Sequence, residues 1–226
     1  SGGLGRPCGR GAGVDRNRLR RPDRGPAAAG EVWTMLIFWK ERLVFLANTR
    51  TGSSSIERAL ETLAHVSVQR PPALKHLPAR EVLAHIAPLL TGVTGEGFTT
   101  VALMRDPVDW VGSWYRSRQR DGIAAAAGSP RGVSFAEFTE DYMAGRVAGF
   151  GGTDRGADLA LGRQSDFLCD DAGRLIVDRV FRYEDIGAFI RFLDDRLGCE
   201  ITLPRLNVSP ASALQLPAPL DLRLRD

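Results

Sequence analysis

Cysteine is scarce in this chain of 226 residues. The three cysteines, Cys8, Cys169 and Cys199, are odd in number and far apart in the sequence. Such spacing indicates neither a disulfide framework nor a cysteine-based metal cluster. We therefore expect a cytoplasmic protein that needs no metal.

Long hydrophobic runs are also missing. No stretch reaches the ~18 apolar residues of a membrane span, because the apolar run Leu36–Trp39 is stopped by the charged run Lys40–Arg42. The arginine-rich start of the chain is not followed by the apolar core of a signal peptide. These absences exclude a membrane-spanning helix, and we expect no membrane partner.

Positive charge is concentrated at one end of the chain. Residues 1–30 hold seven arginines against two aspartates, a net charge of +5 in a chain whose total is +3, so the rest carries −2. The segment is rich in glycine and proline and lacks apolar periodicity, which is typical of disorder. Its charge allows contact with nucleic acid or anionic lipid, but we favour a solvated leader and expect no nucleic-acid partner.

The stretch Leu43–Leu60 is the most informative part of the sequence. The run Leu43–Ala47 is rich in strand formers, and a helical pattern follows from about Ser54. Between them, Arg50–Ser55 supplies one cation, one glycine and four hydroxyl side chains. The N–H groups and dipole at the start of a helix, together with hydroxyl donors, hold phosphate or sulfate well. The alternative is a simple strand-to-helix turn capped by serine.

The remaining pattern predicts a single α/β domain. Thr99–Met104 is β-branched and apolar, as expected for a parallel strand buried on both faces. Alternation of strand and helix indicates parallel pairing with right-handed connections. The other predicted elements are helices at 55–65, 79–90, 108–120, 134–144 and 185–198, a helical turn at 163–168 and a strand at 175–182.

A second anion site is expected where the strand 99–104 ends. Arg105 follows the strand directly, and Ser113 lies within the first two turns of the next helix. Open α/β sheets bind ligands at the carboxyl ends of their strands, so both anion sites should share one sheet edge. The alternative is that Arg105 pairs with Asp106 or Asp109 and that Ser113 is an ordinary helix residue.

Four segments resemble motifs of bacterial sulfotransferases that use 3′-phosphoadenosine 5′-phosphosulfate and are related to carbohydrate sulfotransferases such as heparan sulfate 2-O-sulfotransferase. The segments are NTRTGSSS at 48–55 (PKTGTT or PKSGTT in the family), MRDPVDWVGSWYR at 104–116 (RDPVDRLVSWYRYR), FRYEDI at 181–186 (RYEDL) and LPRLNVS at 203–209 (LPxLNxS). The resemblance covers about residues 43–209. The first segment is not the nucleotide-triphosphate loop GxxxxGK[ST], because Ser53 stands where its lysine would be.

The resemblance implies a three-layer α/β fold of the P-loop-NTPase-like sulfotransferase kind, with a mainly parallel sheet flanked by helices. It implies that Arg105 and Ser113 bind the 3′-phosphate and that Arg50 also stabilises the leaving oxygen. The residues implied for the 5′-phosphosulfate are Arg50, Thr51, Gly52, Ser53, Ser54 and Ser55. Asn48 and Arg50 replace the proline and lysine of the family, and arginine is not equivalent to lysine at a transferring group.

Sulfuryl transfer to a hydroxyl also needs a base, and histidine titrates nearest to neutral pH. His76 lies in KHLPAREV, which resembles the KHATARE segment of the family, and the resemblance implies that His76 is the general base. A structural or acceptor-binding histidine is the alternative, while His65 and His85 are expected to be ordinary helix residues. Lys75 is one of only two lysines among thirty basic residues, and we expect it to assist at the leaving oxygen.

By family analogy, Arg163 and Gln164 are candidates to reach the cofactor or the acceptor. Arg182 and Glu184 are expected to brace the fold.

We therefore expect an enzyme, a sulfotransferase that transfers a sulfuryl group to a hydroxyl on a carbohydrate or small molecule. A P-loop-like nucleotide kinase or NTPase and a catalytically silent cofactor-binding protein are the alternatives. Residues 1–34 are expected to be a disordered basic leader or upstream sequence, with Met35 a candidate native start, 35–210 the sulfotransferase domain and 211–226 a C-terminal tail. The glycine-rich segments 122–131 and 145–156 are expected to build the acceptor pocket.

Overall fold

The structure, a computed structural model, describes residues 35–68, 77–120, 132–147, 161–204 and 214–225. All of these residues belong to the second of two compact units of the chain, residues 31–226. Among them, no helix is long and apolar enough to cross a membrane.

Five strands of the described residues form one mixed sheet with the order β3–β1–β2–β4–β5. Their bounds are Met35–Phe38 (β1), Leu43–Leu46 (β2), Val66–Val68 (β3), Thr99–Met104 (β4) and Arg179–Arg182 (β5). β2 pairs parallel with β4 and β4 with β5, whereas β1 runs antiparallel to both β2 and β3. Four strands therefore point the same way, which confirms the predicted α/β class with a mostly parallel sheet.

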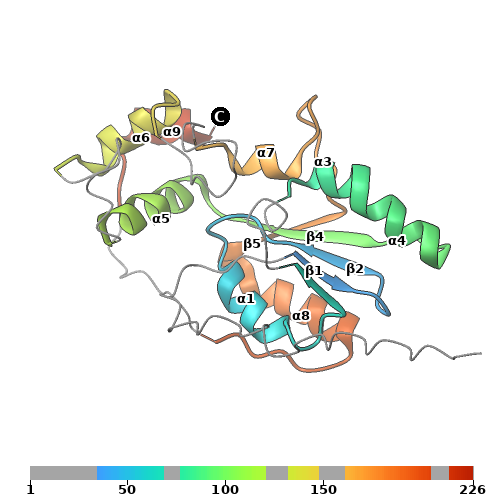
Figure 1. Cartoon of the computed structure of the whole chain (residues 1–226). Coiled ribbons are helices and arrows are strands. Elements are labelled where there is room, and N and C mark those ends of the chain that lie inside the picture. Colours follow the sequence, from blue (N-terminus) through green and yellow to red (C-terminus); the bar gives the residue numbers. More distant parts are fainter. Residues whose placement is uncertain (1–34, 69–76, 121–131, 148–160, 205–213, 226) are drawn as a thin grey trace, which may run out of the picture. The chain divides into compact units, whose positions relative to one another are not determined.

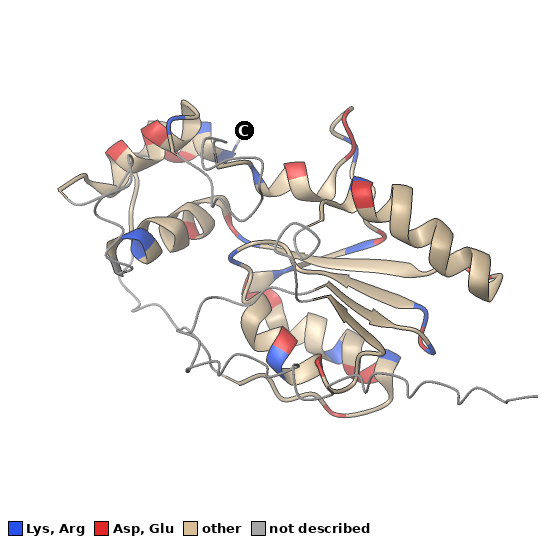
Figure 2. Cartoon of the chain, viewed as in Figure 1, with Lys and Arg blue, Asp and Glu red and all other residues tan. Residues whose placement is uncertain are grey.

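The central strands β1, β2 and β4 contain no charged residue, and charge gathers in the turns and helices around them (Figure 2). Every residue of β1 and β2 is buried, as are the four residues Thr100–Leu103 of β4. A strand covered on both faces cannot alternate apolar with polar residues, because neither of its faces meets water. This explains the continuous apolar runs in the sequence.

Helices cover both faces of the sheet (Figure 1). On one face lie α1 (Ser53–Leu60) and α8 (Ile186–Leu197), and on the other lie α7 (Gln164–Leu168) and the continuous helix formed by α3 (Ala79–Glu81), η2 (Val82–Ile86) and α4 (Ala87–Thr94). Alternate residues of each central strand enter the two cores. The first core includes Leu36, Phe45, Ile56, Leu60, Leu103, Phe189 and Leu193, and the second includes Ile37, Leu46, Val82, Leu90, Ala102 and Leu168.

A third apolar cluster joins three helices beyond the sheet. These are α5 (Pro107–Arg120), α6 (Phe135–Met143) and α9 (Ala218–Arg225). Aromatic side chains dominate the cluster, with Trp110 and Trp114 on α5 and Phe135 and Phe138 on α6. No pattern in the sequence predicted α9, which lies in the segment expected to be a tail.

Helix ends agree well with the sequence signals. Ser134 and Glu137 form the predicted capping box of α6, with Ser134 Oγ accepting from the N–H of Glu137 at 3.3 Å. Asp185 caps α8, which ends at Gly198 in the left-handed conformation, as predicted. The predicted extension of the first helix to residue 65 is wrong, because α1 ends at Leu60 and the chain then turns into β3.

Candidate functional site

Three strand ends meet at the candidate site. The register pairs Leu46 of β2 with Ala102 of β4, and Met104 of β4 with Arg182 of β5. The segments that follow the three strands therefore lie next to one another at the carboxyl edge of the parallel part of the sheet. Ligands of open α/β sheets bind at this edge.

The loop between β2 and α1, residues 47–52, is fastened on two sides. Asn48 Nδ2 donates to the carbonyl of Leu103 at 3.2 Å, which extends the β2–β4 contact beyond the end of β2. Thr51 Oγ1 donates to the carbonyl of Asn48 at 2.9 Å, and both side chains are buried. From α5, Trp110 Nε1 donates to the carbonyl of Thr49 at 2.8 Å.

The amino end of α1 offers hydrogen-bond donors. Gly52 is its N-cap residue, with φ 72°, and its carbonyl accepts from the N–H groups of Ser55 and Ile56 at 3.0 and 3.3 Å. The N–H groups of Ser53 and Ser54 have no acceptor within the helix, as is usual for a first turn. Ser53 is 0% exposed, and among the described residues its hydroxyl has no hydrogen-bond partner.

Arg105 connects the three strand ends. Its Nη1 donates to the carbonyl of Arg50 at 3.4 Å, and its guanidinium lies 4.8 Å from the ring centre of Tyr183. Gln164 of α7, 6% exposed, holds the Arg105 backbone at both polar atoms, accepting from the N–H at 2.9 Å and donating to the carbonyl at 2.8 Å. The Nε of Arg105 is buried and has no hydrogen-bond partner among the described residues.

One face of α5 lies against the loop. Trp110, Trp114 and Ser117 recur at helical spacing, and each contacts residue 49 or residue 50. Ser113 belongs to the same stripe, one turn before Ser117, and is 8% exposed. The structure thus brings the predicted pair Arg105 and Ser113 to the same sheet edge as the loop.

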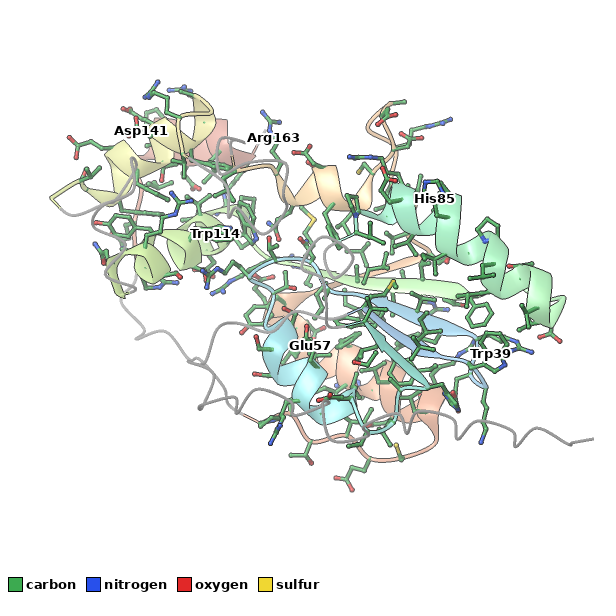
Figure 3. The ribbon with its side chains drawn as sticks, in the orientation of Figure 1. Trp39, Glu57, His85, Trp114, Asp141 and Arg163 are labelled. Carbon is green, nitrogen blue, oxygen red and sulfur yellow. The ribbon has the colours of Figure 1, made fainter. Side chains whose placement is uncertain are left out.

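The side chain of Arg50 packs against α5. The residue is 6% exposed and has φ 60°, a left-handed conformation that is uncommon for arginine. Its guanidinium lies 4.3 Å from the ring centre of Trp114 (labelled in Figure 3), and Nη2 donates to Ser117 Oγ. Burial lowers the pKa of Arg118 on α5, and the nearby charge of Arg50 lowers it further.

Asp106 pairs with the last described helix and not with Arg105, the alternative that the sequence left open. Arg225 of α9 donates to its carboxylate, which also accepts from the N–H groups of Val108 and Asp109 at 3.0 and 3.3 Å and so caps α5. The backbone N–H of Asp106 donates to the carboxylate of Glu184 at 2.7 Å. Burial raises the pKa of Asp106, but these hydrogen bonds and the charge of Arg225 outweigh burial and hold the pKa below its ordinary value of 3.8.

The other predicted residues are less informative. Lys75 and His76 lie outside the described residues. His65 is not in a helix as expected, and its Nδ1 accepts from the N–H of Trp39 at 3.1 Å. His85 is exposed beside Glu81, at 3.5 Å. Among the described residues, no group of three or more His, Cys, Asp or Glu side chains is placed to hold a metal ion.

Sequence reasoning missed three features of the site. Tyr183 and Gln164 contact Arg105 although they lie far from it in the sequence. Such contacts depend on how distant segments pack, and no local motif predicts them. Ser117 could have been found from its spacing, because it lies on the same helix face as Trp110 and Trp114.

Comparisons with protein-family models, with curated proteins and with solved structures found no match for this chain.

Proposed function

We propose that this domain is a sulfotransferase that moves a sulfuryl group from 3′-phosphoadenosine 5′-phosphosulfate to a hydroxyl of a carbohydrate or small metabolite. The observation that carries the proposal is the hydrogen bond from Arg105 to the carbonyl of Arg50. It joins the two segments whose sequences resemble phosphate-binding motifs, and a donor with phosphates at both ends needs two neighbouring sites. The P-loop-NTPase-like sulfotransferase fold belongs to the same proposal and is supported by the mostly parallel sheet with a loop and helix after β2.

Two buried donors favour an anionic ligand at this edge. Among the described residues, Ser53 Oγ at the start of α1 and Arg105 Nε at the end of β4 have no hydrogen-bond partner. A buried donor left unpaired costs about 1–3 kcal/mol, a cost that a phosphate or sulfate oxygen would remove. The positive end of the α1 dipole adds to the attraction.

The proposed chemistry is an in-line transfer. The bond between sulfur and the bridging phosphate oxygen breaks, and a bond between sulfur and the acceptor oxygen forms. Because negative charge grows on the bridging oxygen, donors fixed around it lower the barrier most. In this proposal Thr51–Ser55 bind the 5′ end, Arg105 and Ser113 bind the 3′-phosphate, His76 takes the proton of the acceptor, and Lys75 assists at the leaving oxygen.

A cofactor-binding protein without turnover is the second candidate. The observation that favours it is the packing of the Arg50 guanidinium against Trp114 and Ser117. In that position the only cation of the loop is engaged by α5, so the loop itself brings no charge to the transferred group.

Calorimetry and a transfer assay separate these functions. We expect adenosine 3′,5′-bisphosphate to bind without magnesium, and labelled sulfate to move from the donor to a hydroxyl compound in a broad acceptor screen. ATP binding that requires magnesium, with no bisphosphate binding, would instead identify a kinase or NTPase. Bisphosphate binding without transfer to any acceptor would identify the silent protein.

Two variants test the assigned roles. Arg105→Ala should weaken bisphosphate binding at least about tenfold, because it removes charged hydrogen bonds worth about 1.5–3 kcal/mol each. His76→Ala should leave this affinity nearly unchanged and abolish transfer. Arg58→Ala is the control, since Arg58 is an exposed arginine on α1. Equal losses of affinity in the Arg105 and His76 variants would refute this division of roles.

A further inference from the structure

The side chain of Arg50 contacts two residues of helix α5, Trp114 and Ser117. Its guanidinium stacks over Trp114 and its Nη2 donates to the buried hydroxyl of Ser117, which is 2% exposed. The neighbouring carbonyl of Thr49 accepts from Trp110. Positions 110, 114 and 117 form one stripe of the helix, so this stripe is the docking face for the loop.

Contacts also fix the backbone conformation of Arg50, whose φ is 60°. A left-handed conformation costs about 1–2 kcal/mol at a residue other than glycine, and it persists only where surrounding contacts fix it. Here the contacts are the stacking on Trp114, the bond to Ser117 and the bond from Arg105 to the carbonyl. The next residues, Thr51 and Gly52, lead directly into the first turn of α1.

Arginine suits this position better than lysine. A guanidinium is planar, so it can stack on an indole ring and still donate in its own plane, whereas an ammonium is a compact point charge. Its centre lies well within the ~6 Å range of cation–π contacts. These requirements differ from those of a cation that follows a leaving oxygen.

We propose that Arg50 is a positioning residue that fastens the β2–α1 loop to α5 through Trp114 and Ser117, and that it does not supply charge to the transferred group. The anion-binding atoms of the loop are then the N–H and hydroxyl groups of the first turn of α1, and Arg50 acts only through them. This inference rests on the proposed function for its kinetic consequences, but the tether itself is a property of the protein without ligand.

The decisive variant is Arg50→Lys. The matched control is Arg58→Lys, which makes the same substitution at an exposed arginine of α1. If Arg50 is a tether, Arg50→Lys and Ser117→Ala each weaken adenosine 3′,5′-bisphosphate binding about tenfold, which corresponds to about 1.4 kcal/mol. The double variant then loses little more than Arg50→Lys alone, because both changes remove one contact. The control binds like the unmodified protein.

A fluorescence measurement tests the tether without ligand. The emission of Trp114 is obtained as the difference between each protein and its Trp114→Phe counterpart. We expect this emission to shift in Arg50→Lys and to stay unchanged in Arg58→Lys. Ser117→Ala serves as the second test if Arg50→Lys does not fold.

Three results would overturn the proposal. They are an Arg50→Lys variant with full bisphosphate affinity and equal or faster transfer, additive losses in the double variant, and an unchanged Trp114 emission. Failure of the unmodified protein to bind bisphosphate would instead overturn the proposed function. In that case the emission of Trp114 and the coupling of positions 50 and 117 in urea unfolding still decide whether the tether exists.

Discussion

Replacing Gly52 by alanine should disturb both the fold and the candidate site. Gly52 has φ 72°, and a Cβ added there would lie 2.6 Å from Cε2 of Tyr183 and 3.5 Å from its Cζ and hydroxyl oxygen. The ring of Tyr183 also lies beside the guanidinium of Arg105. A displaced ring therefore changes the surroundings of Arg105 as well as those of the loop.

The expected cost follows from three contributions. The left-handed conformation costs about 1–2 kcal/mol at alanine, and the stiffer unfolded chain returns about 0.4–1 kcal/mol. Moving the Tyr183 ring adds the cost of an overpacked contact, about 1–3 kcal/mol. We therefore expect Gly52→Ala to lower the free energy of unfolding by about 1–5 kcal/mol, with about 3 kcal/mol in the middle of that range.

Gly95 provides a matched control. It has the same φ of 72° at the end of α4, but among the described residues no atom beyond its immediate neighbours in the chain lies within 4 Å of the position of an added Cβ. Gly95→Ala thus bears the conformational cost without the collision, and we expect a loss of at most about 1.6 kcal/mol. Urea unfolding followed by circular dichroism measures both variants.

Equal losses of the free energy of unfolding in the two glycine variants would contradict a collision between the added Cβ and Tyr183. A second check uses the Tyr183→Ala background, in which the collision at Gly52 is absent. There the effect of Gly52→Ala should fall to that of Gly95→Ala. Bisphosphate affinity, measured on the same proteins, should be unaffected by Gly95→Ala and weakened by Gly52→Ala.

Three further predictions concern the supports of the site and of α6. Arg225→Ala removes the hydrogen bond that lowers the pKa of Asp106. The variant should therefore have a lower free energy of unfolding than the unmodified protein near neutral pH, and this difference should shrink as the pH falls below 3.8 and Asp106 becomes protonated. Equal differences in the urea midpoint at about pH 7 and about pH 3 would contradict this expectation. Ser134→Ala should lower the free energy of unfolding by about 1 kcal/mol, with Ser134→Thr close to the unmodified protein. Gln164→Leu leaves the N–H and carbonyl of Arg105 without their partner and should lower the free energy of unfolding by about 1–3 kcal/mol in the same titration, and an unchanged urea midpoint would contradict this role of Gln164.

The parts of the fold that were predictable have local causes. Proline at position 107 and glycine at 198 each fix a helix end through their backbone, and aspartate at 185 does so through its side chain; the structure confirms all three ends. The strands at 43–46 and 99–104 were readable because a buried parallel strand must be apolar throughout.

The missed elements depend on distant partners. β1 and β3 contain four and three residues, too short for a periodic signal, and they exist because β1 pairs with both β2 and β3. The sequence pattern predicted a helix beyond Leu60, but the chain leaves the helix there and goes on to form β3, which pairs with β1. The C-terminal helix α9 likewise owes its position to the aromatic cluster on α5 and α6.

The candidate site likewise has one part that the sequence predicts and one part that depends on packing between distant segments. The sequence predicted that the β2–α1 loop and Arg105 share one edge, because strand order and strand direction bring them together. It did not predict where the Arg50 side chain points, since that depends on which face of α5 passes the loop. The roles of Lys75 and His76 stay predictions, because both residues lie outside the described part of the chain.

The strand order also has a consequence for the time course of folding. β1 and β2 are joined by a four-residue turn and form a hairpin, which closes within microseconds in small systems, whereas β4 must find β2 across more than 50 residues of chain. The β2–α1 loop receives its support from Leu103, Arg105 and Trp110 only after that long closure. A chain in which only the hairpin has formed lacks these contacts, so the candidate site is complete only after β4 has paired with β2.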